Sequence, residues 1–169
     1  MSNIWIGKNY CTSSHRILVL GESWYGENGP LPMWIEKWAA GERDATFSRI
    51  FNAASEYKIP KADRYEERMK WWHEISFYNF VASAGPTRKH RPTKDLYDAA
   101  KLPLEIVLRT YKPKGVWILG KGQSEYSESV IEAAGIHMKT VAHPTSFGLK
   151  TVDLRESWRT LRSIINAGT

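Results

Sequence analysis

Two polar side chains, Asn79 and His143, stand in apolar surroundings where their chemistry could act on a ligand. Asn79 interrupts the stretch FYNFV, and its amide offers both a donor and an acceptor, which suits the edge of a nucleobase. His143 follows the stretch MKTVA, and Pro144 after it favours an extended or turn backbone. A histidine held there can donate a hydrogen bond to a developing anion. Taken singly, each is also explained by a structural role within the fold.

The hexapeptide GESWYG, residues 21–26, is a third candidate, because it follows the apolar run ILVL directly. Glu22 and Ser23 would place a carboxylate and a hydroxyl just beyond a buried strand, with Trp24 and Tyr25 after them. We expect the strand to end at residue 20 and the hexapeptide to form a turn. Taken alone, this piece is better explained as a tight turn in which Glu22 is a cap.

Two further segments carry charge in a loop-like context. The segment TRKHRPT could contact phosphate, although a solvated charged loop is the commoner case; its basic and titratable side chains are Arg88, Lys89, His90 and Arg91. The segment GKGQSEYSES lacks the full Gly-x-x-x-x-Gly-Lys-Ser/Thr spacing of a phosphate loop. We expect a strand-to-helix turn there, with Ser124 as the helix N-cap.

Short apolar runs alternate with stretches of helical spacing, which predicts an α/β fold with a parallel sheet covered on both faces. The predicted strands are 17–20, 75–81, 115–119 and 138–142, and the predicted helices are 32–40, 44–57, 63–73, 94–112, 123–134 and 150–166. In such sheets, ligands bind beyond the carboxyl ends of the strands. Glu22, Asn79 and His143 would all fall at that edge.

The composition favours one cytoplasmic domain with a polyanionic partner. The 169 residues carry a net charge of +6, which suits nucleic acid but says nothing about the fold. Eight Trp and eight Tyr are unusually many, and we expect most of them in the core and some near the surface, where they can stack on a ligand. The single Cys11 excludes a disulfide framework and a cysteine-ligated cluster within one chain. The sequence shows neither a signal peptide nor a membrane-spanning run.

In their order along the chain, these pieces resemble the uracil-DNA glycosylase superfamily over about residues 15 to 150. The family-four type opens with Gly-Glu-Ala-Pro-Gly, which is similar to Gly21-Glu22-Ser23. Its Asn-x-Val and Asn-Arg-x-Pro segments are similar to NFV and KHRPT, and its Pro-x-x-x-x-x-x-Gly strand to YKPKGVWILG. Its final His-Pro-Ser is similar to His143-Pro144-Thr145.

The resemblance implies a single domain over residues 1–169 with three α/β/α layers and a four-stranded parallel sheet of order 2-1-3-4. It implies a DNA glycosylase that hydrolyses the N-glycosidic bond of uracil, or of another damaged or modified base, after flipping it out of DNA. Water would be the nucleophile, and no metal or other cofactor would take part. We expect a monomer that binds single- or double-stranded DNA and no membrane.

The resemblance also assigns roles to the residues of the site. Asn79 would pair with the Watson–Crick edge of the base, and His143 would stabilise negative charge at its O2. Ser23 stands where many members hold the Asp or Asn that positions the water, and Glu22 would orient the pocket or the water. The tyrosine that excludes a C5 methyl group corresponds to Tyr25.

The remaining roles concern stacking and the DNA backbone. Either Phe47 or Trp24 would supply the stacking face for the base. Phe147 lies where family members carry an apolar wedge that enters the duplex. The DNA-binding set would comprise this wedge, its neighbours Thr145 and Ser146, and the basic loop Arg88, Lys89, His90 and Arg91.

Three departures from the family pattern leave other functions open. Ser23 is neutral and cannot act as a general base, Trp24 replaces the family's proline, and the iron–sulfur cysteines of family four are absent. One subgroup traps its product through a loop histidine, but His90 stands one residue short of that spacing. The alternatives are a weakly active or inactive module that binds a base or DNA, and an enzyme of free nucleosides or nucleotides.

Overall fold

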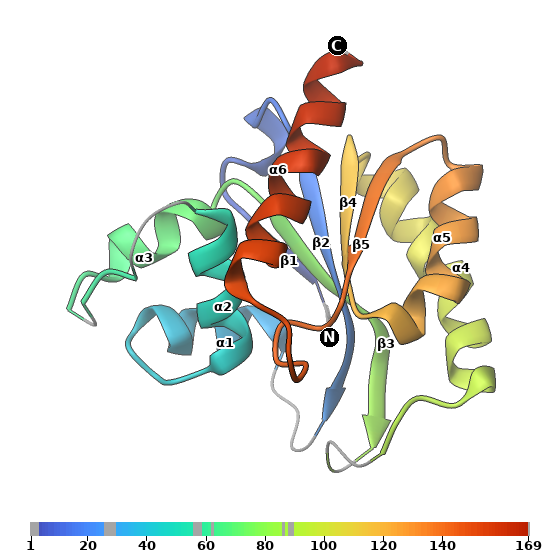
Figure 1. The fold of residues 1–169 in the computed structure, drawn as a ribbon, viewed down its shortest axis with the longest axis horizontal. Helices are drawn as coiled ribbons and strands as arrows, with labels where there is room; N and C mark the ends of the chain where they lie inside the picture. The colour runs from blue at the N-terminus through green and yellow to red at the C-terminus, as the bar shows by residue number, and fades with distance from the viewer. Residues whose placement is uncertain are drawn as a thin grey trace.

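The protein is built around a five-stranded mixed sheet of order β1-β3-β2-β4-β5 (Figure 1). The structure, a computed structural model, describes residues 4–25, 30–55, 59–61, 63–85, 87 and 90–168. The strands are β1 Ile4–Ile6, β2 Ile17–Tyr25, β3 Ser76–Gly85, β4 Gly115–Leu119 and β5 His137–Val141. The expectation of an α/β fold is confirmed.

The expected four-stranded, all-parallel sheet is wrong, because β1 adds an antiparallel edge. β1 pairs with β3 through the register Trp5↔Phe77, whereas β2 is parallel to β3 and β4, and β4 is parallel to β5. The four strands that the sequence predicted lie side by side as β3-β2-β4-β5. Three residues are too few to show the alternation of apolar and polar side chains that indicates a strand, so the sequence did not predict β1.

β2 and β3 are longer than predicted, and this changes the setting of the polar residues. β4 accompanies β2 only as far as Gly21, but the ladder of β2 with β3 continues through Ser23↔Val81 to Tyr25↔Gly85, with a register shift on the way. The expected turn at residues 21–26 is therefore wrong at residues 21–25, which belong to the strand. Glu22 and Ser23 lie on a two-stranded extension that rises above the end of β4.

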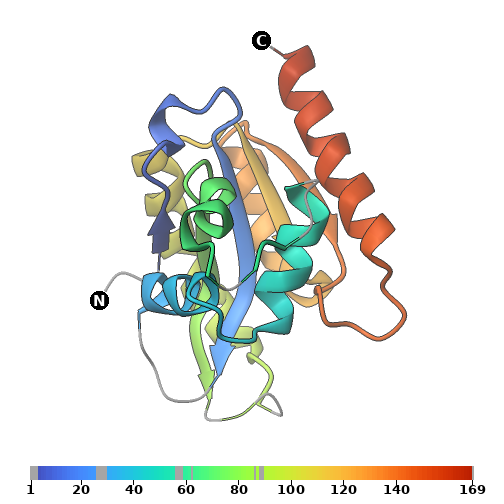
Figure 2. The ribbon, with the colours of Figure 1, turned by 90° about the vertical axis from the view of Figure 1, so that its left-hand side faces the viewer.

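Helices cover both faces of the sheet (Figures 1 and 2). They are α1 Leu31–Ala39, α2 Ala45–Ala54, α3 Tyr65–Trp72, α4 Lys94–Tyr111, α5 Lys121–Ala133 and α6 Thr151–Ala167, together with the short 3-10 turn η1 Tyr10–Thr12. Each overlaps a predicted helix except η1. Val19 and Trp117 point into the core under α1, α2, α3 and α6, whereas Leu20 and Val116 point into the core under α4 and α5.

Local capping fixes where the helices near the sheet edge begin. The Asp44 carboxylate accepts the backbone N–H of Phe47 at 2.8 Å, which starts α2. The Thr93 hydroxyl does the same for α4. The expected N-cap at Ser124 is wrong, because α5 already begins after Gly120, whose φ of +133° suits glycine alone. Ser124 instead donates to the carbonyl of Lys121 at 2.8 Å.

Most of the tryptophans belong to the core, as the composition suggested. Trp5, Trp38 and Trp117 are buried, and each indole N–H finds an acceptor, at distances of 2.8, 3.0 and 2.9 Å. Trp24, Trp34 and Trp71 are only partly buried and lie at the edge of the core. In the described ranges, we find no helix that combines the length and the apolar character needed to cross a membrane.

Candidate functional site

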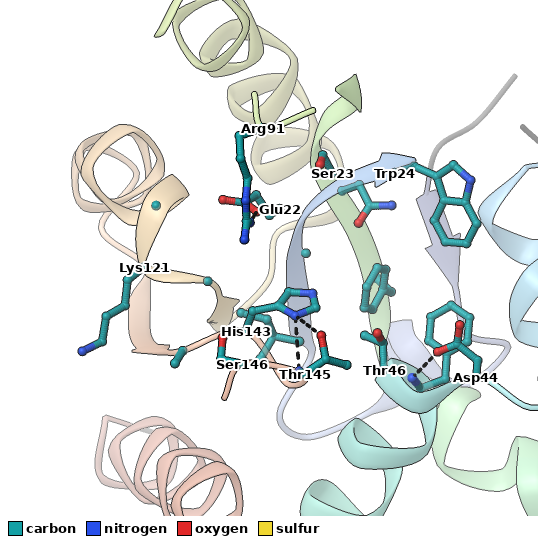
Figure 3. Close-up of a pocket in the computed structure, with 18 of the residues that line it drawn as sticks. Glu22, Ser23, Trp24, Asp44, Thr46, Arg91, Lys121, His143, Thr145 and Ser146 are labelled. Atoms are coloured by element: carbon teal, nitrogen blue, oxygen red, sulfur yellow. Dashed lines mark hydrogen bonds and ion pairs between the residues drawn. The ribbon is translucent and has the colours of Figure 1, made fainter. Parts of the chain in front are cut away.

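A pocket of about 720 Å³ lies at the carboxyl ends of the parallel strands (Figure 3). The structure brings most of the predicted site residues to its walls: Glu22, Ser23, Trp24, Phe47, Asn79, Arg91, His143, Thr145 and Ser146. They come from β2, β3, the start of α2 and the loops after β3 and β5. The prediction that Glu22, Asn79 and His143 lie together at this edge is therefore confirmed, and their roles toward a ligand stay predictions.

Asn79 and Gly21 lie opposite each other in the β2–β3 ladder, and the glycine makes room for the amide. A Cβ atom at Gly21 would lie 2.4 Å from Asn79 Oδ1 and 3.0 Å from Phe77 Cζ, closer than packed atoms allow. The Asn79 side chain makes no hydrogen bond to any residue that the structure describes, although the residue is only 6% exposed. A buried amide without a partner is a group that a ligand can satisfy.

His143 follows β5, and its ring is held by its neighbour Thr145 (Figure 3). The backbone N–H of Thr145 donates to His143 Nδ1 at 3.3 Å, and the Thr145 hydroxyl lies 3.0 Å from the same atom. A backbone N–H can only donate, so Nδ1 must accept. The neutral ring therefore carries its proton on Nε2. This tautomer gives the ring one N–H donor.

Glu22 is tied to the other side of the pocket. Its Oε1 atom accepts from the Tyr97 hydroxyl at 2.8 Å, and its Oε2 atom pairs with Arg91 Nη1 at 3.1 Å. The closely placed Gly122 leaves room for this carboxylate, because a Cβ atom there would lie 2.9 Å from Oε1. Figure 3 shows Glu22 beside Arg91, with Trp24 across the pocket. Glu22 thus joins β2 to the basic loop and to α4.

Ser23 lies on the strand extension, with its hydroxyl oxygen buried. That oxygen has no hydrogen-bond partner in the described part of the chain. Burying a hydroxyl without a partner costs about 1–3 kcal/mol, which a bound water or ligand group would recover. A water or ligand group must form a hydrogen bond with this hydroxyl before Ser23 can position that group.

Aromatic side chains form the wall that faces His143. Phe47 packs edge to face on Phe77, with ring centroids 6.0 Å apart, and is only 3% exposed. Trp24 is half-buried and leans on Trp34 of α1, with centroids 5.1 Å apart. Both of the predicted stacking residues therefore line the pocket, and Trp24 offers the larger accessible surface.

The predicted DNA-binding residues divide into three groups. Arg91, Thr145 and Ser146 line the pocket, whereas Phe147 is fully exposed beyond it. His90 is exposed, and its Nδ1 atom lies 3.0 Å from the Thr87 hydroxyl. Arg88, Lys89 and the side chain of Tyr25 lie outside the described residues, so their predicted roles stay predictions.

Four lining residues with polar side chains were not predicted as site residues: Asp44, Thr46, Tyr97 and Lys121. An acidic residue at the predicted start of a helix is a capping signal, and it could have placed Asp44 at this edge. Tyr97 is 75 positions from its partner Glu22, and no local pattern indicates that contact. The Lys121 side chain points away from His143 (Figure 3). Among the described residues, no group of His, Cys, Asp or Glu side chains could hold a metal ion.

Comparison with known proteins assigns no family to this chain. No protein-family model matches it, and no curated protein matches its sequence. The function must therefore be argued from the chemistry of the site.

Proposed function

We propose that the protein is a DNA glycosylase that hydrolyses the N-glycosidic bond of uracil, or of another damaged or modified base, after the base has been flipped out of DNA. The observation that carries this proposal is the convergence of the Asn79 amide, the His143 ring and an aromatic wall on one pocket. A flipped base needs those three things: a partner for its edge, a donor for the charge that it develops, and a stacking surface.

The base would lie against Trp24 and Phe47, with its Watson–Crick edge on the Asn79 amide. When the glycosidic bond breaks, negative charge grows on the departing base. The His143 Nε2–H group would donate to that charge, and Thr145 holds the ring in the tautomer that allows it. Donors already oriented in the free protein stabilise a transition state without reorganising at the moment of reaction.

The nucleophilic water needs a polar group on the sugar side of the pocket. Ser23 has the position that the family resemblance gives to this group, and its buried oxygen has no hydrogen-bond partner among the described residues. Among the described lining residues, the carboxylates are Glu22 and Asp44. Glu22 uses one oxygen for Tyr97 and the other for Arg91, whereas Asp44 uses only Oδ1, for the Phe47 N–H. Of the two, Asp44 keeps an oxygen that no described residue binds, so it is the better candidate for holding a water.

DNA is the partner that the rim of the pocket fits. Arg91 lies at the rim with 74% of its side chain exposed, and Phe147 projects fully from the loop after β5. Flipping a base costs a few kcal/mol, which an inserted apolar side chain and phosphate contacts offset. The net charge of +6 supports the same partner.

One observation favours a second candidate, a module that recognises a base in DNA with little or no turnover. The Ser23 hydroxyl, at the position expected to hold the water, is neutral and has no hydrogen-bond partner among the described residues, so Ser23 itself supplies no base. Such a module would keep Asn79, the aromatic wall and the basic rim, and would lack only the chemical step.

The experiment that tests the proposal is a cleavage assay on labelled oligonucleotides. Each carries uracil, hypoxanthine, xanthine, hydroxymethyluracil or a mismatch, in single or double strands, and alkali reveals abasic sites. Wild-type protein is compared with His143→Ala. Excision that the variant loses supports the glycosylase. Binding to the same oligonucleotides without excision supports the recognition module. Turnover of free nucleosides, insensitive to Arg91→Gln, would overturn both.

A further inference from the structure

A second cavity, of about 980 Å³, lies at the opposite edge of the sheet from the candidate site. Ile17 at the start of β2 and Ile75 just before β3 contribute to its floor, and its walls come from α2, α3 and α6. The two cavities share no described lining residue. Nothing in the proposed glycosylase mechanism uses this second cavity.

The floor of the second cavity is apolar and largely aromatic. Phe51 and Trp158 are buried there, and Trp71 is half-buried between them. Trp71 meets both rings edge to face, with centroids 6.3 Å from Phe51 and 5.7 Å from Trp158. Three rings in this arrangement offer faces and edges to a flat apolar body.

The rim of the cavity is cationic. Its positively charged residues are Lys61, Arg64, Lys70 and Arg162, and its negatively charged residues are Glu67 and Glu74. Arg64 is neutralised by Glu67 at 3.0 Å. Lys61, Lys70 and Arg162 form no ion pair with any residue that the structure describes. The rim therefore keeps an excess of positive charge around an apolar floor.

The pKa of His15, which lines the cavity, is affected by the same positive charges. Burial lowers the pKa of this histidine, and the nearby charges of Arg162 and Lys114 lower the pKa further, against the opposing effect of Glu74. A hydrogen bond with Asn166 also raises the pKa of His15. A negatively charged group bound at this edge would relieve the crowding of cations.

We propose that this second cavity is a binding site for a small aromatic anion. The flat body of the ligand lies on Phe51, Trp71 and Trp158, and its carboxylate, sulfonate or phosphate group lies at Lys61, Lys70 and Arg162. Both halves of this description are needed. An apolar ligand would leave the cations without counter-charge, and an inorganic anion would leave the accessible part of the Trp71 ring uncovered.

The test uses 1-anilinonaphthalene-8-sulfonate as the probe and the indole N–H signals of ¹⁵N-labelled protein as reporters. The signals of Trp71, Trp158 and Trp24 are assigned from their Trp→Phe variants. We expect saturable binding of one probe per chain, with shifts of the Trp71 and Trp158 signals. The Trp24 signal reports the candidate functional site and should stay in place. Shifts confined to Trp24, or spread over every indole, would overturn the proposal.

Charge variants test the second half of the proposal. The double change Lys61→Gln and Lys70→Gln should weaken probe binding by about fivefold, given the usual strength of exposed charge pairs. The uncharged analogue N-phenyl-1-naphthylamine should bind the wild-type protein more weakly than the probe does. Its affinity should be the same for the double variant as for the wild type. Lys139→Gln, at an exposed position on β5, is the matched control. An equal loss in that control, or none in the double variant, would contradict the proposed role of the rim.

Discussion

Arg91 Nη1 lies 3.1 Å from Glu22 Oε2, and the two side chains differ sharply in exposure, at 74% for Arg91 and 9% for Glu22. A buried carboxylate thus anchors the guanidinium end of an exposed arginine side chain at the rim of the pocket. The pair joins the strand extension to the loop between β3 and α4, which carries the basic segment. Glu22 is in this way a positioning residue for the rim that we propose binds DNA, with Tyr97 as its second anchor.

Tyr97→Phe should lower the free energy of unfolding by about 1.5–3 kcal/mol, because it removes a donor from a buried carboxylate. Urea unfolding measures this loss. Tyr126→Phe is the matched control, since Tyr126 stacks on Tyr97 at 4.6 Å and its hydroxyl does not bind Glu22. Equal losses in the two variants would show that the hydrogen bond to Glu22 contributes nothing.

Arg91→Gln should weaken DNA binding uniformly across sequences and reduce the slope of log affinity against log salt by about 1, as expected for one lost phosphate contact. Titration of a fluorescent oligonucleotide at several salt concentrations measures both quantities. Lys112→Gln, which removes a cation just after α4 and away from the pocket lining, is the control. An unchanged slope in Arg91→Gln would remove this residue from the DNA interface.

Gly21→Ala should abolish recognition of the base, because the new Cβ atom would displace the Asn79 amide or the Phe77 ring. The cost of such overpacking is about 1–3 kcal/mol of unfolding free energy. Excision or base binding is measured beside thermal unfolding. Gly135→Ala is the control: its Cβ atom meets nothing within 4 Å, and only its positive φ of +67° opposes the change. Full activity in Gly21→Ala would contradict the placement of Asn79.

Acid should destabilise the fold in part through His73. Burial lowers the pKa of His73 from 6.5, and Lys8 lowers the pKa further against Glu66. The unfolded chain therefore takes up this proton at a higher pH than the folded chain. The free energy of unfolding should fall as the pH drops below about 6.5, and His73→Gln should make the fall shallower. Urea midpoints between about pH 8 and pH 5 measure the slope. An identical slope in the variant would contradict this account.

Much of the architecture was predictable from the sequence, because helical periodicity and short apolar runs are local signals. They placed six helices and four strands, and parallel topology alone was enough to bring Asn79 and His143 to one edge. Pairing between strands is not a local signal. The apolar run ends at Leu20, yet β2 continues to Tyr25 because β3 remains beside it.

The contacts that organise the pocket could not be predicted from sequence patterns. The Glu22–Tyr97 hydrogen bond spans 75 positions, and the pairing of Glu22 with Arg91 spans 69. A carboxylate after an apolar run reads equally well as a cap, a catalytic group or an anchor. Only its surroundings in the folded chain distinguish these roles.

The most direct test of the proposed function separates the chemical step from DNA binding in His143→Ala. Single-turnover excision and oligonucleotide affinity are measured for this variant, for wild type and for His137→Ala, an exposed histidine on β5. If His143 stabilises the transition state, its loss should slow excision by about 10²–10³-fold and leave affinity nearly unchanged. Equal losses of rate and affinity, or a full rate without His143, would contradict the account.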